Sequence, residues 1–282
     1  MKSLYIYRIV KIWFKYSLAL VFHYTGLNQW LIKKGRSDYI LMLHRISDHS
    51  DVLNISIKLK NLAEVIKWCN EVGLITHMDD FVRKDSEHTQ FAITFDDGYE
   101  SVIRVLVLPQ NVPMTVYLST GFIDTQRSFW ATYLESLLMS NSIQSLDLTH
   151  FNLGCYSLNS YRQRRNAILI LNKKMKQLHP DKIQAVMDEL EDKYDTKIDN
   201  EFLNWNQVRE LSKAGVVIGS HTHNHAITSR LTKKDFEHEI AMSHNLIEQQ
   251  LGEAVGHFAY PNGQTQDIAD FCHDVLKKAC FN

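Results

Sequence analysis

The 282-residue sequence has little cysteine and little proline, with four of each. The cysteines are scattered and form no CxxC pair, which argues against both a zinc ribbon and a disulfide framework. Net charge is also nearly absent, at −1, so nothing favours a nucleic-acid or polyanionic partner. Apolar residues make up 45% of the chain, enough for the core of one large domain with or without an appendage. We therefore expect reduced thiols, a full hydrophobic core and no nucleic-acid partner.

Residues 1–35 lack an uninterrupted apolar run. Arg8, Lys11 and Lys15 recur every three or four residues, which places them on one face of a helix. These cations argue against a transmembrane span, and no small-residue cleavage site follows to indicate a secretory signal. Two interpretations stay open: a helix that packs its apolar face on the domain, or a basic amphipathic helix that contacts a membrane surface through residues 1–30. We expect a protein in the cytoplasm or peripherally on the inner membrane face.

The stretch from Phe91 to Tyr99, FAITFDDGY, joins an apolar run to two adjacent carboxylates. The run has the length and composition of a buried strand, and Gly98 after it permits a sharp turn. We expect Asp96 and Asp97 at the carboxyl end of that strand, where α/β folds place their sites. Two ionised carboxylates this close repel each other, so a cation, a proton or a wet setting has to hold them. A strand-to-loop turn with solvated aspartates is the alternative.

A second strand-like run, Val216–Ile218, is followed by three histidines at positions 221, 223 and 225. Neutral imidazole is a common ligand of transition metals. His221 and His225 are four residues apart, so a helical turn or a tight loop can aim both at one ion. One added carboxylate would complete a catalytic Zn²⁺ or Fe²⁺ set with open positions. A polar loop that is rich in histidine by chance is the alternative.

Strands and helices alternate around these stretches. We expect a buried strand over Tyr39–Ile46, a helix over 61–72, another helix over 101–107 and a strand over Met114–Leu118. This β-then-α order favours parallel strands with helical crossovers.

Three motifs together resemble those of one family. Thr94–Gly98 (TFDDG) is similar to the first motif of the polysaccharide deacetylases, carbohydrate esterase family 4. His221–His225 (HTHNH) resembles their second motif, His-Ser/Thr-x-x-His, and Phe258–Gly263 (FAYPNG) resembles a variant of the third. The resemblance runs from Tyr39 to Asn282, and the order and spacing of three motifs make it specific.

The resemblance implies a fold and an activity. It implies an α/β fold, an incomplete and distorted (β/α) barrel of about seven strands, over residues 36–282, after the N-terminal helical segment 1–35. It also implies a hydrolase of carbon–nitrogen bonds that removes acetyl groups from N-acetylated sugars of a bacterial-type surface or cell-wall polysaccharide.

Site roles follow from the same resemblance. Asp97, His221 and His225 match the residues that hold a divalent metal, Zn²⁺, which leaves positions for water and substrate. Asp96 matches the catalytic base, which takes a proton from the attacking water. The backbone N–H of Asn262 matches the position that helps bind the oxyanion.

Five further residues stand beside these. Thr222 is expected to brace the histidine loop through its hydroxyl, and His223 falls between the two ligand positions. Tyr260 and Pro261 belong to the third motif and are expected beside the substrate. His44 ends the first strand, where it lies near the site or on the surface.

The region of about 128–200 interrupts the strand–helix alternation with two helical patterns, over 129–139 and 161–194. We expect a helical insert that caps the barrel mouth. A basic cluster marks its middle: Arg162, Arg164, Arg165, Lys173, Lys174 and Lys176. Two interpretations of the cluster stay open. It belongs to a lid that gates substrate entry or binds an anionic glycan, or it is a solvated helix face.

The sequence departs from the family pattern at two places. Ala259 stands where many members have arginine, and no segment matches the late Leu-x-His motif of the general acid, since His257 and His273 lie in other contexts. We therefore expect the general-acid motif and the last strand or strands to be missing, and three explanations stay open: a truncated chain, another group such as His44 serving as the acid, or weak catalysis. Two alternatives stay open: a truncated or degenerate protein that binds metal and glycan with little turnover, and a hydrolase of non-sugar C–N bonds such as a cyclic imide.

Overall fold

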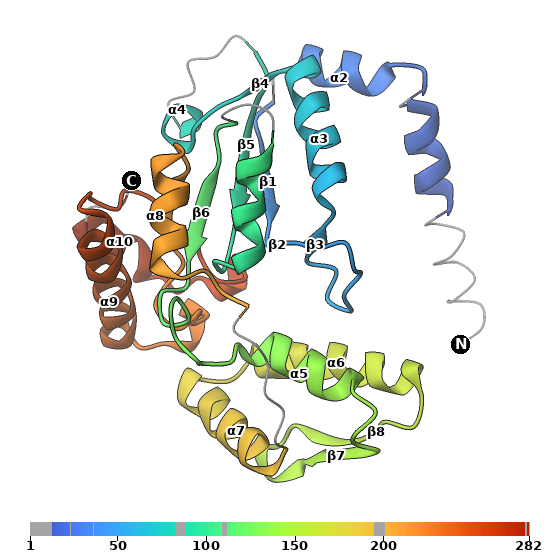
Figure 1. Ribbon diagram of the computed structural model, residues 1–282, viewed down its shortest axis with the longest axis vertical. Helices are drawn as coiled ribbons and strands as arrows, with labels where there is room; N and C mark the ends of the chain where they lie inside the picture. Colours follow the sequence, from blue (N-terminus) through green and yellow to red (C-terminus); the bar gives the residue numbers. More distant parts are fainter. Residues whose placement is uncertain are drawn as a thin grey trace.

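The computed structural model describes residues 13–22, 24–35, 37–82, 88–108, 112–194, 201–279 and 281. Figure 1 shows a sheet with helices beside it, and the insert packed below the sheet as a separate layer of helices and a hairpin. The carboxyl ends of the central strands β5 and β6 point toward that insert.

Within the described part of the chain the main sheet has five strands, all paired in parallel. They are β1 (Tyr39–Leu43), β4 (Leu74–Ile75), β5 (Gln90–Phe95), β6 (Thr115–Leu118) and β9 (Val217–Ser220). The order is β1-β5-β6-β9, with β4 also paired to β5, and all six residues of β5 are buried. The parallel strands are therefore confirmed, and the carboxyl ends of β5, β6 and β9 meet at one edge of the sheet.

Closure of the sheet into a barrel of about seven strands stays a prediction. Beyond β9 the sheet continues through one parallel bridge between Ser220 and Phe258, flanked by the hydrogen bonds Ser220 N to His257 O and Ala259 N to Ser220 O, each 2.9 Å. This bridge places the third motif next to the second. A short parallel pair, β2 (Arg45–Ile46) with β3 (Ser56–Ile57), lies outside the main sheet.

The prediction of a buried strand over Tyr39–Ile46 is wrong in one respect, because most of this strand is not buried. It divides into β1 and β2, and Ile40 and Met42 are 52% and 59% exposed. The reason is position, because among the described residues β1 pairs only with β5 and so forms an edge of the sheet.

Helices follow the strands as the sequence indicates. The elements are α3 (Leu59–Val72), α4 (Met78–Val82), η1 (Glu100–Val107), α8 (Trp205–Lys213), η3 (Thr228–Arg230), α9 (Lys233–Leu251), η4 (Thr265–Asp267) and α10 (Cys272–Lys278). The expected helix over 61–72 is confirmed as α3, with Leu62 and Ile66 on its buried face. The segment over 101–107 is helical too, but as the tighter 3₁₀ form.

In its described residues the insert comprises three α-helices, one short 3₁₀ helix and an unpredicted hairpin. They are α5 (Trp130–Met139), β7 (Ser145–Leu148), η2 (Thr149–Phe151), β8 (Gly154–Ser157), α6 (Tyr161–Met175) and α7 (Pro180–Lys193). β7 and β8 pair antiparallel, and their residues alternate in burial on β7. Each strand has four residues, too short for the alternation to stand out in the sequence.

The basic middle of the insert is not a uniform solvated face. Arg164 is 5% exposed, and its guanidinium donates to the carbonyls of Leu138 (2.8 Å), Ile143 (2.9 Å) and Ser140. This arginine therefore pins the end of α5 to α6, and Lys176, described below, faces the candidate site.

The N-terminal segment is helical over residues 13–22 and in α2 (Leu27–Gly35), which packs near α3 (Figure 1). The Thr89 hydroxyl donates to the Ile32 carbonyl at 2.9 Å and fastens α2 to the domain. Ile32 of α2 packs against the buried cluster of Cys69, Val72 and Phe91, whereas Trp13 and Phe14 remain 70% and 67% exposed, so the packing expected of this segment holds for α2 and not for these two side chains. Arg8 and Lys11 lie outside the described residues. Among the described helices, none has the length and apolarity needed to cross a bilayer.

The thiols in the described part of the chain are free, as expected. Cys69 and Cys272 are buried, whereas Cys155 is exposed. Burial raises the pKa of Cys69 to about 11, so this thiol is inert at neutral pH. Cys280 lies outside the described residues.

Candidate active site

The loops that follow β5 and β9 bring one carboxylate and two imidazoles together. Asp97 Oδ1 lies 3.4 Å from His221 Nε2 and 3.1 Å from His225 Nε2. The three candidate ligand atoms all lie within 4.8 Å of one another. Asp97 and His221 are buried, and the His225 side chain is 11% exposed. The two motifs, more than a hundred residues apart in the sequence, thus form one cluster.

A hydrogen bond sets the tautomer of His221. Its Nδ1 lies 2.9 Å from the carbonyl of Ala259, which can only accept, so Nδ1 carries the proton. The lone pair of neutral His221 is then on Nε2, the nitrogen that faces Asp97. Such a bond to the far nitrogen of an imidazole is the usual way in which a metal-binding histidine is oriented.

The backbone of the three motifs is strained. Asp97, Thr222, His225 and Asn262 have φ values of 74°, 64°, 53° and 64°. Non-glycine residues seldom adopt this left-handed region, and a β-branched residue such as Thr222 is disfavoured there. Strain of this kind persists only where surrounding contacts fix the backbone.

Those contacts come from Thr222 and from α9. The Thr222 hydroxyl accepts from the Ala226 N–H at 3.0 Å, which is the brace expected from the sequence. Glu239 of α9 accepts from the backbone N–H groups of His223 (2.9 Å) and Asn224 (2.7 Å). His223 turns its Nδ1 to the Thr120 hydroxyl at 2.9 Å, so it lies outside the cluster.

The Asp97 cluster fits a divalent cation. Asp97 Oδ1 is buried and has no hydrogen-bond partner in the described structure, although two imidazole nitrogens face it. Burial alone would raise the pKa of Asp97, but His225 and His221 hold it well below its usual value. One anionic oxygen and two imidazole nitrogens form the donor set that Zn²⁺ favours in catalytic sites.

Asp96, the neighbouring carboxylate, has a different environment. Its Oδ1 is buried and also lacks a hydrogen-bond partner among the described residues. Burial raises the pKa of Asp96, and the charge of Asp97 acts in the same direction, although His221 opposes them. The two adjacent acids are thus unlike, one faced by imidazoles and the other free to accept a proton.

A cavity of about 300 Å³ opens onto this cluster. It is lined by Asp96, Asp97, His221 and His225, and also by His44, Tyr260 and Asn262, which the sequence placed near the site. Pro261 is buried in the third motif and Thr222 is buried in the second. The structure thus brings the candidate residues to one place, while their roles stay predictions.

Three residues at or beside the site lie outside the three sequence motifs: Lys176, Trp130 and Glu239. Lys176 and Trp130 line the cavity from the insert. Lys176 Nζ donates to Asn262 Oδ1 at 2.7 Å. Glu239 could have been noticed, because it lies next to Ile240 and three residues after Phe236 on the buried face of α9, where a lone carboxylate needs partners.

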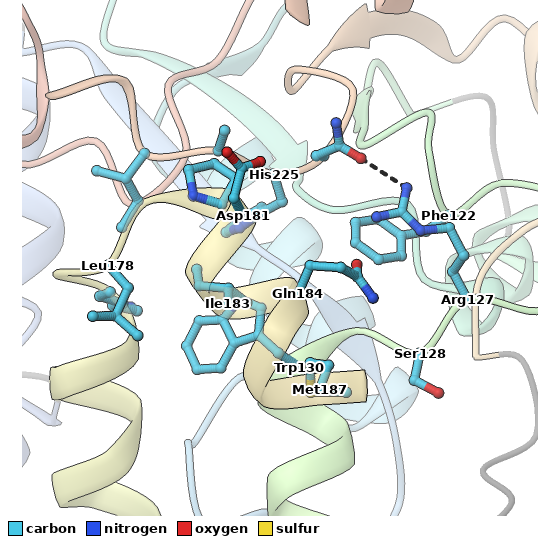
Figure 2. Close-up of a pocket in the computed structure, with 15 residues that line it drawn as sticks. Phe122, Arg127, Ser128, Trp130, Leu178, Asp181, Ile183, Gln184, Met187 and His225 are labelled. Carbon is cyan, nitrogen blue, oxygen red and sulfur yellow. Dashed lines mark hydrogen bonds between the residues drawn. The ribbon is translucent and has the colours of Figure 1, made fainter. Parts of the chain in front are cut away.

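A second cavity, of about 220 Å³, adjoins the first and shares Trp130, Lys176 and His225 with it. Figure 2 shows side chains of the insert, including Gln184, facing the loop that carries His225. Arg127 closes one side, where its Nη1 donates to Asn224 Oδ1 at 2.7 Å. The insert therefore forms a wall of the space next to the cluster.

Comparison with known proteins shows the family of the chain. The family model for polysaccharide deacetylases matches residues 83–279, about 70% of the chain. The chain belongs to this family. Its members are hydrolases that act on carbon–nitrogen bonds, so this polysaccharide deacetylase is an enzyme of that class. No curated protein matches the chain.

Solved structures share the deacetylase fold. IcaB from Ammonifex degensii has a TM-score of 0.55 at 16% identity, covering 87% of this chain and 81% of that one. A de-N-acetylase from Aggregatibacter actinomycetemcomitans has a TM-score of 0.53 at 17% identity, with 86% and 85% covered. The Streptococcus pyogenes deacetylase PplD has a TM-score of 0.52 at 14% identity, with 86% and 80% covered. At these identities the likeness concerns the fold.

Proposed function

We propose that this deacetylase is a metal-dependent hydrolase that removes acetyl groups from N-acetylated sugars of a bacterial-type surface or cell-wall polysaccharide. The observation that carries the proposal is the convergence of Asp97, His221 and His225 on one point, with Asp96 in the same cavity. The buried Asp97 Oδ1, which two imidazoles face and which has no hydrogen-bond partner among the described residues, supports a bound cation.

Each residue of the site has its own role in the proposed reaction. A divalent ion, Zn²⁺ in our proposal, would polarise the acetyl carbonyl and lower the pKa of the attacking water when bound. Asp96 accepts the proton of that water, because its oxygen is unpaired and faces the same cavity. The backbone N–H of Asn262 donates to the acetyl oxygen as its negative charge develops. His221 keeps its position through the bond to Ala259.

Metal content and acetate release test this proposal together. We expect the purified chain to hold one divalent ion per molecule and to release acetate from N-acetylglucosamine oligomers. Asp97→Ala should lose both, whereas Asp192→Asn, at an exposed position of α7, should keep both. Ion binding without acetate release would indicate a binding protein, and release from small amides alone would indicate a different C–N hydrolase. Absence of the ion would contradict the proposal.

The insert is proposed to contact the glycan beyond the acetylated sugar. The second cavity supports this, because α5 and α7 line it and it shares three residues with the first. An aromatic side chain with polar neighbours suits a sugar ring, and Trp130 lies there with Arg127 and Gln184.

Residues 13–31 are proposed to contact a membrane surface. Their exposed apolar side chains support this: Trp13, Phe14, Tyr16, Leu18, Leu20, Val21, Tyr24, Leu27, Trp30 and Leu31. Lys15, Lys33 and Lys34 add positive charge that anionic lipids attract. Trp13→Glu/Phe14→Glu should reduce co-sedimentation with anionic vesicles, whereas Tyr161→Glu on α6 should not. Equal binding by all three proteins would contradict the membrane contact. A cytoplasmic or inner-face location stays a prediction.

A further inference from the structure

We propose that Lys176, which the helical insert contributes, is a catalytic residue of this site. Its ammonium group contacts the acetyl oxygen of the bound substrate and stabilises the negative charge that develops there. The inference rests on the proposed function, because it names a further group for the same reaction. It also means that the insert takes part in the reaction and does not only line the cavity.

Lys176 reaches the site from a distant part of the chain. It is the residue that caps the C-terminus of α6, and its Nζ donates to Asn262 Oδ1 at 2.7 Å. Asn262 is the residue whose backbone N–H we assign to the developing oxyanion. The Asn262 amide also donates to Asp267 Oδ2, so its side chain is held from both ends. The ammonium therefore lies on the oxyanion side of the cavity.

The ammonium retains donors for a ligand. A lysine has three N–H donors, and Asn262 takes one of them in the described structure. The carbonyls at the end of α6 favour a cation at this position. Lys176 lines the 300 Å³ cavity together with Asp96 and His225, so its side chain borders the space that substrate would enter.

The charge of Lys176 is the feature that makes this contact useful. Among the described residues that line the cavity, Lys176 is the only lysine or arginine. Hydrolysis of an amide places negative charge on the carbonyl oxygen, and a cation fixed beside that oxygen stabilises the developing charge. Asp96 and Asp97 add negative charge to the same cavity, which increases the need for a cation near the acetyl oxygen.

A competing account is that Lys176 only positions Asn262. The two accounts predict different activities for the same pair of variants. Asn262→Gly removes the side-chain contact while keeping the backbone N–H, and glycine accepts the φ of 64° at this position. If Lys176 acts only through Asn262, Asn262→Gly should lose as much activity as Lys176→Met. If the ammonium contacts substrate directly, Lys176→Met should lose more.

The experiment measures kcat and KM for acetate release, and separately the affinity of the zinc-loaded chain for acetate, which needs no turnover. Lys176→Met should lower kcat by about 10²–10³-fold, as the loss of one oxyanion donor does elsewhere. It should also weaken acetate binding, while zinc content and melting temperature stay at the values of the unaltered chain. Lys176→Arg should restore part of kcat. Lys173→Met, one turn earlier on an exposed position of α6, is the matched control.

The outcomes separate this inference from the proposed function. Full activity and unchanged acetate affinity in Lys176→Met would overturn the inference and leave the deacetylase intact. Equal losses in Lys176→Met and Asn262→Gly would also overturn it. If the unaltered chain binds zinc and acetate but releases none, the proposed function fails, whereas weaker acetate binding in Lys176→Met alone would still support the contact.

Discussion

Glu239 and Asn224 are joined by two hydrogen bonds. Glu239 Oε2 accepts the backbone N–H of Asn224 at 2.7 Å, and Oε1 accepts its side-chain amide at 2.6 Å. Asn224 lies between the two candidate ligand histidines, so α9 holds the loop that aims them. Outer contacts of this kind set how well ligands are placed before a metal arrives.

Glu239→Gln should therefore weaken zinc binding. Glutamine has one acceptor oxygen where glutamate has two, so its NH₂ would face a backbone or side-chain N–H of the loop. We expect a 10–100-fold loss of zinc affinity, measured against a competing chelator. We also expect a loss of about 1–3 kcal/mol in the free energy of unfolding. Glu237→Gln, exposed on the same helix, is the control; equal zinc affinity in both variants would contradict the role of Glu239.

Asp96→Asn should separate proton transfer from metal binding. The asparagine amide cannot accept the proton of the attacking water, whereas the three candidate ligand side chains remain. We expect zinc content to match that of the unaltered chain and kcat to fall by about 10²–10⁴-fold. Elemental analysis and acetate release on the same preparation measure both. Loss of zinc in this variant would show instead that Asp96 helps to hold the ion.

Gly98→Ala tests the sharp turn after the two carboxylates. Gly98 has φ of 89°, and a Cβ there would lie 2.9 Å from Leu118 Cδ2 and 3.0 Å from Ile123 Cδ1. Gly215 is the matched control, because its φ is 90° and no atom lies within 4 Å of an added Cβ. Both alanine variants should lose stability through φ, by about 1 kcal/mol. Gly98→Ala should lose a further 1–3 kcal/mol or so through crowding. Equal urea midpoints would contradict the crowding.

Asp51 should make stability depend on pH. Burial raises the pKa of its carboxyl. The side chain of Ser56, the N–H groups of Ile55 and Ser56, and the charge of Arg45 lower that pKa, and together they outweigh burial, so the folded pKa is below the usual value. The stabilising contribution is therefore present above the unfolded pKa, about 3.9, and is lost as pH falls through the folded value.

Asp51→Asn measures this contribution. At pH 7 the variant should unfold at lower urea concentration than the unaltered chain, and the difference should shrink as pH falls below about 4. Asp192→Asn, at an exposed position of α7, supplies the comparison. A difference that stays constant from pH 7 to pH 3 would show that the Asp51 charge has no part in it.

The features of this protein that could be predicted are the motifs, helices and strands that short contiguous segments of the sequence form. Asp97, His221 and His225 stand in short motifs at strand ends, and the resemblance of those motifs to the polysaccharide deacetylases singled them out as candidate ligands. The expected helix 61–72 and strand 114–118 have strong periodicity and proved correct as α3 and β6. These elements can be recognised locally because a helix buried on one face, or a strand buried on both faces, has a matching pattern of apolar residues in its own segment.

The parts that sequence did not reveal depend on tertiary packing. In the sequence Lys176 is one of the six cations of the basic cluster, and only the docking of α6 against the third motif places it beside Asn262. Arg164, four residues from Ser160, is buried by carbonyls that lie more than twenty residues away. β1 has the composition of a buried strand, and its exposure follows from its place at a sheet edge, which no local pattern encodes.

Gln184→Trp tests whether the insert contacts the glycan. Gln184 lies on α7 and lines the 220 Å³ cavity (Figure 2), so an indole there would fill part of that space. If the cavity holds a neighbouring sugar, kcat/KM should fall for longer N-acetylglucosamine oligomers and change little for the shortest one that is cleaved. Each lost sugar contact is worth on the order of 1 kcal/mol, about a fivefold change. Zinc affinity should stay the same, because the cluster itself is untouched.

The neighbouring position supplies the control for this prediction. Ala185 is exposed on α7 and does not line the cavity, so Ala185→Trp adds the same side chain outside the space in question. A length-dependent loss in Gln184→Trp that is absent from Ala185→Trp would place the polysaccharide chain along the insert. The same loss for every oligomer length would mean that the indole disturbs the shared residues Trp130 and His225, and a lack of any loss would mean that the glycan leaves the site in another direction.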